Sequence, residues 1–228
     1  MKTLVSAVTA GALVLGTVAF AANKHTDRIN DAAQVLRDIH AAPDKDIPQE
    51  LWEHAACAIV IPDLKKAAFI VGGEYGKGLM SCRRGGSWGA PVFMELEKGS
   101  WGLQIGAQEI DLVLLVMNKN GMEKLLNNKV QLGAEASVSA GPVGRDARAG
   151  TDAQMKAEIL SYSRAQGLFA GIDISGGKLG PDQDSNKIVY HDASARDILM
   201  GGKVAPPAIA QDFMRALGRE AKATTGRK

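Results

Sequence analysis

The residues whose spacing first suggests chemistry are Gly85-Gly86-Ser87-Trp88-Gly89, which match the G-x-S-x-G pattern of a hydrolase nucleophile. In such enzymes the serine sits on a sharp turn between a strand and a helix. Here Pro91 follows the motif and prevents a helix from continuing through it. A serine hydrolase that uses Ser87 with His54 or His191 as base is therefore an alternative, and the sequence predicts that the protein is not an enzyme.

Metal ligation is poorly supported by the spacing of the potential ligands. The chain has four histidines: His25, His40, His54 and His191. They share no ligand spacing and no C-x-x-C pair occurs, so we expect no zinc. Asp182-x-Asp184-x-Asn186 resembles the start of a calcium loop, but Lys187 stands where Gly is needed and Ala193 where a bidentate Glu is needed. This segment is interpreted as a polar turn, and neither a metal nor another cofactor is predicted.

Basic side chains in glycine-containing segments indicate an anion-binding surface. The candidate residues are Lys65, Lys66, Lys77, Arg83, Arg84, Arg145 and Arg148. Residues 72–78 and 141–148 combine these cations with glycines, whose backbone N–H groups can be presented to a phosphate. If the loops converge, they form one anion-binding face; the alternative is dispersed, solvated charge.

The two cysteines, Cys57 and Cys82, lie in strand-like runs. In an exported protein such a pair predicts a disulfide. Closing a loop of about 25 residues would stabilise the fold by about 3.5 kcal/mol. The alternative is a pair of separate buried thiols.

The N-terminus has the features of a secretory signal: Lys2, an apolar run over residues 4–20, and the small-residue site Ala19-Phe20-Ala21. We therefore expect residues 1–21 to be removed and the product to be exported, periplasmic or secreted. A transmembrane anchor is the alternative, but Gly11 and Gly16 dilute the run and no stop-transfer charges follow. The remaining residues, 22–228, are expected to form a single domain.

Composition excludes some classes of partner. The 228 residues include 27 basic and 25 acidic side chains, so overall charge gives no reason to expect nucleic-acid binding. Aromatic residues make up only 5% of the chain, whereas 26 residues are glycine. The core must therefore be built mainly from Ala, Val, Ile and Leu, with many tight turns.

Hydrophobic periodicity predicts an α+β fold with helices at both ends. Apolar residues at helical spacing predict an amphipathic helix over residues 26–41, which lies either on a membrane or on its own domain. Further helices are expected at 47–54, 121–126, 193–200 and 206–221. Strand-like runs occur at 57–61, 68–72, 78–83, 88–95, 101–116, 130–140, 159–162 and 167–174. This pattern predicts a strongly bent antiparallel sheet or partial barrel, flanked by the N- and C-terminal helices.

Six ordered blocks of sequence resemble the SYLF lipid-binding domain family over about residues 28–217. They are Ala58-Ile59-Val60-Ile61-Pro62; Phe69-Ile70-Val71-Gly72-Gly73 with Tyr75-Gly76-Lys77-Gly78; Trp88-x-Ala90-Pro91; residues 102–108; Gly133-x-x-Ala136-Ser137-Val138-x-x-Gly141-Pro142-Val143-Gly144-Arg145; and Tyr162-Ser163-x-x-x-Gly167-Leu168-Phe169-Ala170-Gly171.

This resemblance implies a zinc-free module that binds phosphoinositides or other anionic phospholipids at a membrane surface, with no catalytic reaction. Eukaryotic members combine the domain with SH3 modules and link membranes to actin assembly, whereas exported bacterial members are more similar to this chain. Because the chain has neither an SH3 segment nor a cytosolic address, we do not expect an actin partner. A structural envelope protein that binds a protein partner is the alternative.

Overall fold

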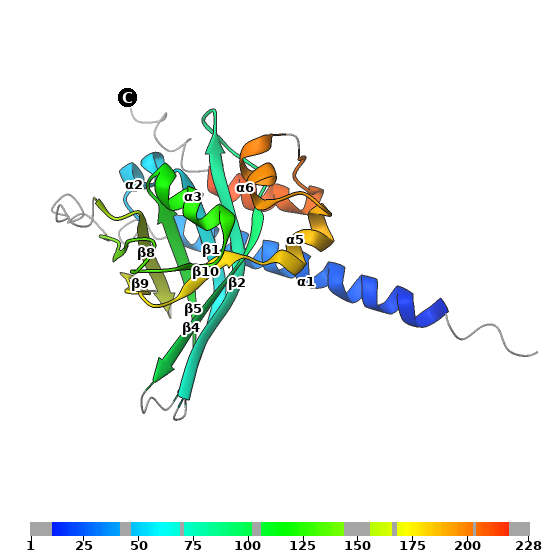
Figure 1. Cartoon of the computed structure of the whole chain (residues 1–228), viewed down its shortest axis with the longest axis horizontal. Helices are drawn as coiled ribbons and strands as arrows, with labels where there is room; N and C mark the ends of the chain where they lie inside the picture. Colours follow the sequence, from blue (N-terminus) through cyan, green and yellow to red (C-terminus); the bar gives the residue numbers. More distant parts are fainter. Residues whose placement is uncertain are drawn as a thin grey trace, which may run out of the picture.

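The computed structural model describes residues 11–41, 47–68, 71–101, 106–143, 156–165, 168–202 and 204–218. Ten strands form one curled sheet in the order β6-β10-β4-β2-β1-β5-β8-β7, with β3 paired to β2 and β9 paired to β8 (Figure 1). The four long central strands are β1 (Cys57–Ala68), β2 (Val71–Arg84), β4 (Val92–Trp101) and β5 (Gly106–Val116). The shorter strands are β3 (Ser87–Trp88), β6 (Val130–Gln131), β7 (Val138–Ala140), β8 (Ile159–Ala165), β9 (Leu168–Gly171) and β10 (Lys178–Pro181).

The helices connect and cover this sheet. They are α1 (Gly11–His40), α2 (Gln49–His54), α3 (Lys119–Asn127), α5 (Gln183–Tyr190) and α6 (Gln211–Gly218), together with the π-helical turn η2 (Asp197–Gly201) and the 3-10 turn η3 (Ala208–Ala210). Helix α1 crosses behind the sheet, packs against β1, β2 and α6, and projects beyond the body at its N-terminal end (Figure 1). The mixed α+β class and the helices at both ends are as predicted.

The apolar stripe of α1 is buried in the protein's own core. Ile29, Leu36 and Ile39 are fully buried, and the nearby Ala32 and Ala33 are as well. This is the 3.6-residue periodicity expected of a helix that docks one face on a sheet. The structure therefore settles the alternative left open by the sequence, because this face of α1 meets its own domain.

Cys57 and Cys82 occupy directly opposed positions on the antiparallel strands β1 and β2 and form a disulfide. The predicted pairing is confirmed. The two strands are direct neighbours in the sheet. The bond joins the first residue of β1 to the last part of β2, beside Arg83 and Arg84.

Several elements differ from the predictions. Strand β10 was not predicted, the run 88–95 is divided between β3 and β4, and the helix expected over residues 206–221 is η3 followed by α6. The run 68–72 is not one strand, because β1 ends at Ala68 and β2 begins at Val71. The sheet is not wholly antiparallel, since β7 and β8 pair in parallel. The polar segment after Pro181 is not a turn but the start of α5, with Asp182 as its N-cap.

Along the described ranges, no helix combines the length and apolarity needed to cross a bilayer.

Candidate functional site

The G-x-S-x-G segment forms the tight turn between β2 and β3. Gly85 and Gly86 have φ values of 55° and 89°, a left-handed conformation that glycine adopts without strain. Across the turn Arg84 pairs with Ser87, and Arg83 with Trp88. Ser87 is therefore an exposed hairpin residue, and the turn joins two strands, not the strand and helix that a hydrolase nucleophile requires.

Arg83 is fixed at the base of this turn by two neighbours. Its guanidinium carbon lies 4.2 Å from the centre of the Trp88 ring, within the range of a cation–π contact. Its Nη2 donates a hydrogen bond of 3.0 Å to the carbonyl oxygen of Trp52, and its backbone N–H donates to Ala56. The side chain is thus held in one orientation while part of it stays accessible to solvent.

Arg84 is exposed and lies against the backbone of Gly202, which follows η2. A Cβ at position 202 would lie 2.0 Å from Nη2 of Arg84, so the Arg84 side chain covers this backbone closely, and the φ of 69° at Gly202 favours glycine there. Among the described residues, no carboxylate pairs with Arg84. Met200, also on η2, is 40% exposed. We call residues 83–87 the arginine turn.

Lys77 has a different environment from the one predicted. Its Nζ lies 2.7 Å from Oδ2 of Asp182, and the same oxygen lies 3.0 Å from Nη1 of Arg28 on α1. Burial alone would raise the pKa of Asp182, but hydrogen bonds from Lys77, Ser185 and Arg28 lower this pKa to about 2. The charge of Lys77 is therefore neutralised inside the protein, and Lys77 is not part of the arginine turn.

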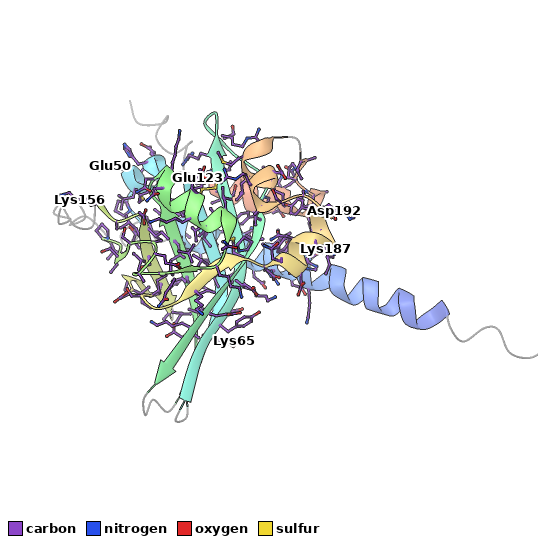
Figure 2. All side chains as sticks on the ribbon, in the orientation of Figure 1. Glu50, Lys65, Glu123, Lys156, Lys187 and Asp192 are labelled. Carbon is purple, nitrogen blue, oxygen red and sulfur yellow. A yellow bond between two sulfur atoms is a disulfide. The ribbon has the colours of Figure 1, made fainter. Side chains whose placement is uncertain are left out.

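Lys65 lies at the opposite end of the same strands (Figure 2). It pairs in register with Tyr75, nine residues before Arg84, which corresponds to about 30 Å along β2. Its side chain is 70% exposed and lies 3.7 Å from Glu109. The side chain of Lys66, and the whole of Arg145 and Arg148, lie outside the described residues. Of the predicted cations, only Arg83 and Arg84 are brought together by the described structure.

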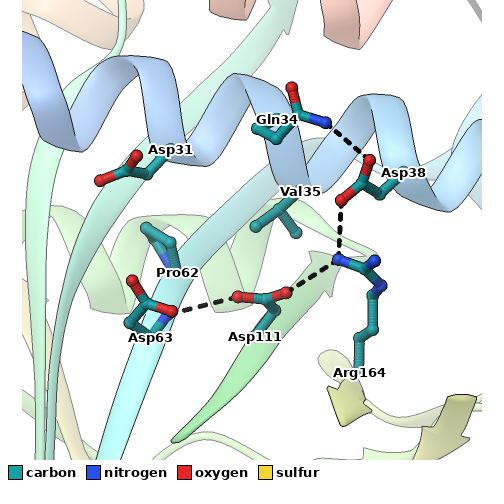
Figure 3. A pocket seen from close by; sticks show the side chains of 8 residues that line it. All are labelled: Asp31, Gln34, Val35, Asp38, Pro62, Asp63, Asp111 and Arg164. Atoms are coloured by element: carbon teal, nitrogen blue, oxygen red, sulfur yellow. Dashed lines mark hydrogen bonds and ion pairs between the residues drawn. The ribbon is translucent and has the colours of Figure 1, made fainter. Parts of the chain in front are cut away.

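A second feature, not predicted from the sequence, is a pocket of about 190 Å³ between α1 and the sheet (Figure 3). It is lined mainly by the carboxylates of Asp31, Asp38, Asp63 and Asp111 and by the guanidinium of Arg164. Asp31 and Asp38 come from α1, whereas the other three come from β1, β5 and β8. We call these four carboxylates with Arg164 the acidic seam. No group of metal-ligating side chains suited to an ion occurs in the described parts of the chain.

The sequence carried signals for some of these contacts and not for others. Asp is a preferred helix N-cap residue, so the role of Asp182, whose Oδ1 accepts from the backbone N–H of Ser185, could have been predicted. Asp63 sits at an irregularity in β1 with a φ of 49°, and the available signal was Pro62, because proline within a central strand is found at bulges. The contacts of Arg164 left no local signal, because its partners are 53 and 126 residues away.

Comparison with known proteins gives a family and several relatives. Residues 97–220, more than half of the chain, match the Ysc84 family, described as "Las17-binding protein actin regulator". An SH3 domain-containing protein of Schizosaccharomyces pombe is 34% identical over 175 residues, covering 75% of this chain and 40% of that protein. Protein YSC84 of Saccharomyces cerevisiae is 29% identical over 195 residues, covering 82% and 42%. The human SH3 domain-containing YSC84-like protein 1 is 30% identical over 194 residues, covering 82% and 56%.

This chain thus spans about half the length, or less, of the curated relatives it matches. The family match begins within β4 and extends through β5 to α5 and α6. The resemblance seen in the sequence blocks and the match to a family profile agree with each other. On these grounds the chain belongs to the Ysc84, or SYLF, family.

Proposed function

We propose that the protein is a non-catalytic module that binds anionic phospholipid headgroups at a membrane surface through the arginine turn. The observation that carries this proposal is the exposed guanidinium of Arg84, which has no carboxylate partner among the described residues and lies beside a glycine turn. The resemblance to lipid-binding SYLF domains supports the same function.

The arginine turn has the chemical groups that a phosphate ester requires. Arginine presents several N–H donors in a planar fork that matches phosphate oxygens. Ser87 adds an exposed hydroxyl, and the left-handed glycines Gly85 and Gly86 present backbone in a turn free of side chains. Arg83 is already oriented by Trp88 and Trp52, which reduces the entropy lost on binding.

Vesicle flotation tests this proposal. The probes are phosphatidylcholine vesicles with and without phosphatidylserine, at low and high salt. We expect binding that needs the anionic lipid and weakens with salt. Arg84→Gln should weaken the partition coefficient about fivefold, since each basic residue near an anionic surface contributes about 1 kcal/mol.

Lys65→Gln is the matched control, because Lys65 is an equally charged, exposed residue at the far end of the same strands. Its binding should equal that of the wild type. Binding that is indifferent to phosphatidylserine, or an equal loss in both variants, would overturn the assignment to the arginine turn. Failure of the wild type to bind any vesicle would instead favour a protein partner, the property that the family description names.

We also propose that the domain acts outside the cytoplasm after removal of residues 1–21. The described anchoring contacts of α1 begin after that point, with the ring contact between His25 and Phe93 and the ion pair of Arg28 with Asp182. Cleavage after Ala21 would therefore leave them intact. Mass spectrometry of the exported protein should give a chain that begins at Ala22; an intact leader on a cytosolic product would refute the proposal.

If the protein is non-catalytic, the hydroxyl of Ser87 should not react as an activated nucleophile. A fluorophosphonate probe should leave Ser87 unlabelled, because the residue lies in a hairpin turn. Labelling that disappears in Ser87→Ala would restore the hydrolase alternative.

A further inference from the structure

The arginine turn has an apolar neighbour, the π-helical turn η2, which contacts β2 at the same end of the sheet (Figure 1). A Cβ at Gly89 would lie 3.5 Å from Cδ of Arg84 and 3.7 Å from the carbonyl oxygen of Leu199, so this glycine lies between the two elements. The guanidinium of Arg84 also covers the backbone of Gly202, just after η2. A surface that contacts Arg84 therefore lies close to the residues that follow Leu199.

The burial pattern of η2 turns one large apolar side chain outward. Ile198 and Leu199 are fully buried and attach the turn to the core. The next residue, Met200, is 40% exposed, and it is followed by the exposed Gly201 and Gly202. Because glycine has no side chain, these two residues do not cover Met200. An apolar side chain is thus presented to the outside from a firmly anchored turn.

Exposed apolar residues continue beyond η2. Ala205 and Ala208 are exposed, and Ile209 is 39% exposed. The sequence from residue 198 to residue 210 contains no acidic side chain. We call residues 200–202 and 204–209 the apolar segment.

The carboxylates at the two ends of this segment have partners of their own. Asp197, the first residue of η2, accepts hydrogen bonds from the hydroxyl and the backbone N–H of Ser194. Asp212, on α6, pairs with Arg215. The cation of Arg84 beside an apolar segment suits a partner that is anionic at its surface and apolar below it. A bilayer of anionic phospholipids has this arrangement, whereas a soluble phosphate ester offers only the charge.

We propose that the apolar segment enters the membrane interface beside the arginine turn, with Met200 as the side chain that inserts. The inference rests on the proposed function, because Arg84 would bring the segment to the headgroups. It adds that the ligand is the bilayer itself and not a free phosphate ester. Arg84 would supply an attraction that salt weakens, and Met200 an apolar contact that salt does not screen.

A fluorescent probe on one introduced cysteine tests this insertion. Cys57 and Cys82 are the two cysteines of the chain and form the disulfide, so Met200→Cys supplies a single thiol for labelling. Labelled with the environment-sensitive dye NBD, this variant should gain about twofold in emission on phosphatidylserine-containing vesicles, because the dye leaves water. Lipids that carry a quencher on the acyl chain should reduce this emission.

Ile188→Cys, labelled in the same way, is the matched control. Ile188 is 55% exposed, more than Met200, but it lies on α5, away from the arginine turn (Figure 1). The exposed Asp184, one helical turn earlier, would be repelled by anionic headgroups. The dye at position 188 should therefore keep the emission that it has in water.

Binding of unlabelled variants gives a second measurement. Met200→Gln should weaken binding to the same vesicles about fivefold, because less apolar surface is buried. Unlike Arg84→Gln, it should leave the salt dependence of the remaining binding unchanged, since no charge is removed. Ile188→Gln should bind as the wild type does. Both variants should keep the wild-type thermal unfolding, because both side chains are exposed.

The outcomes separate this inference from the proposed function. If the protein binds vesicles while the dye at position 200 stays silent, or responds no more than the dye at position 188, the headgroups are held without insertion. The inference then fails alone, and the apolar segment is left as a surface for a protein partner. Equal binding by Met200→Gln and the wild type would refute it as well. If the wild type binds no vesicle, the proposed function fails, and the inference fails with it.

Discussion

Lys77 and Asp182 lie 105 residues apart in the sequence, and their side chains meet with 2.7 Å between Nζ and Oδ2. Arg28 reaches the same carboxylate from α1, so one buried oxygen connects the first helix, strand β2 and the start of α5. A carboxylate that is almost fully buried tolerates its charge only with such partners.

Removing this carboxylate should therefore destabilise the fold strongly. Asp182→Ala leaves Arg28 and Lys77 without their partner and removes the N-cap of α5. We expect a loss of about 3 kcal/mol in the free energy of unfolding, measured by urea denaturation. Asp184→Ala, an exposed change two residues later, should cost less than about 0.5 kcal/mol. Equal effects in the two variants would contradict the role of the cluster.

The same carboxylate predicts how the protein responds to strong acid. The pKa of Asp182 is lowered from 3.8 to about 2, so its contribution is present in full above about pH 4 and is lost as the pH falls through about 2. By linkage this contribution amounts to about 2 kcal/mol. Urea titrations from pH 5 to pH 2 should show this loss in the wild type and a smaller one in Asp182→Asn.

The disulfide should contribute independently of these charges. Cys57→Ala with Cys82→Ala opens a loop whose ends are 25 residues apart, and we expect a loss of about 3.5 kcal/mol in the free energy of unfolding. Reduction of the unfolded wild type should lower its refolded stability to the same extent. The double variant should be insensitive to the reductant; sensitivity there would show that the reductant acts elsewhere.

Close packing of β2 on β1 predicts a sharp contrast between two glycines. A Cβ at Gly78 would lie 2.0 Å from the carbonyl oxygen of Val60, so the backbone would have to move. Gly78→Ala should cost about 3 kcal/mol. Gly99→Ala on β4 meets nothing within 4 Å and should be neutral or stabilise by up to about 1 kcal/mol. Thermal unfolding of both variants provides the comparison.

The sequence predicted those parts of the fold whose signal is local. The helix of residues 26–41 followed from its apolar stripe, and the disulfide from two cysteines in strand-like runs. The boundary between β1, which ends at Ala68, and β2, which begins at Val71, was missed because the apolar run continues across it. The parallel pairing of β7 with β8 was missed because register between distant segments leaves no local mark.

The candidate site shows the same limit. Seven cations were identified by type and by neighbouring glycines, but charge alone could not separate Arg84 from Lys77. The partner of Lys77 is far away in the sequence, and only the folded chain brings it near. The acidic seam could not be predicted from the sequence for the same reason, because its carboxylates come from three separate elements.

Helix α1 packs against α6, so two described helices that are far apart in the sequence meet. During synthesis the apolar side of α1 stays without this cover until the residues of α6 have been made. This part of the core can therefore close only late, and the fold depends on a contact between distant segments of the chain.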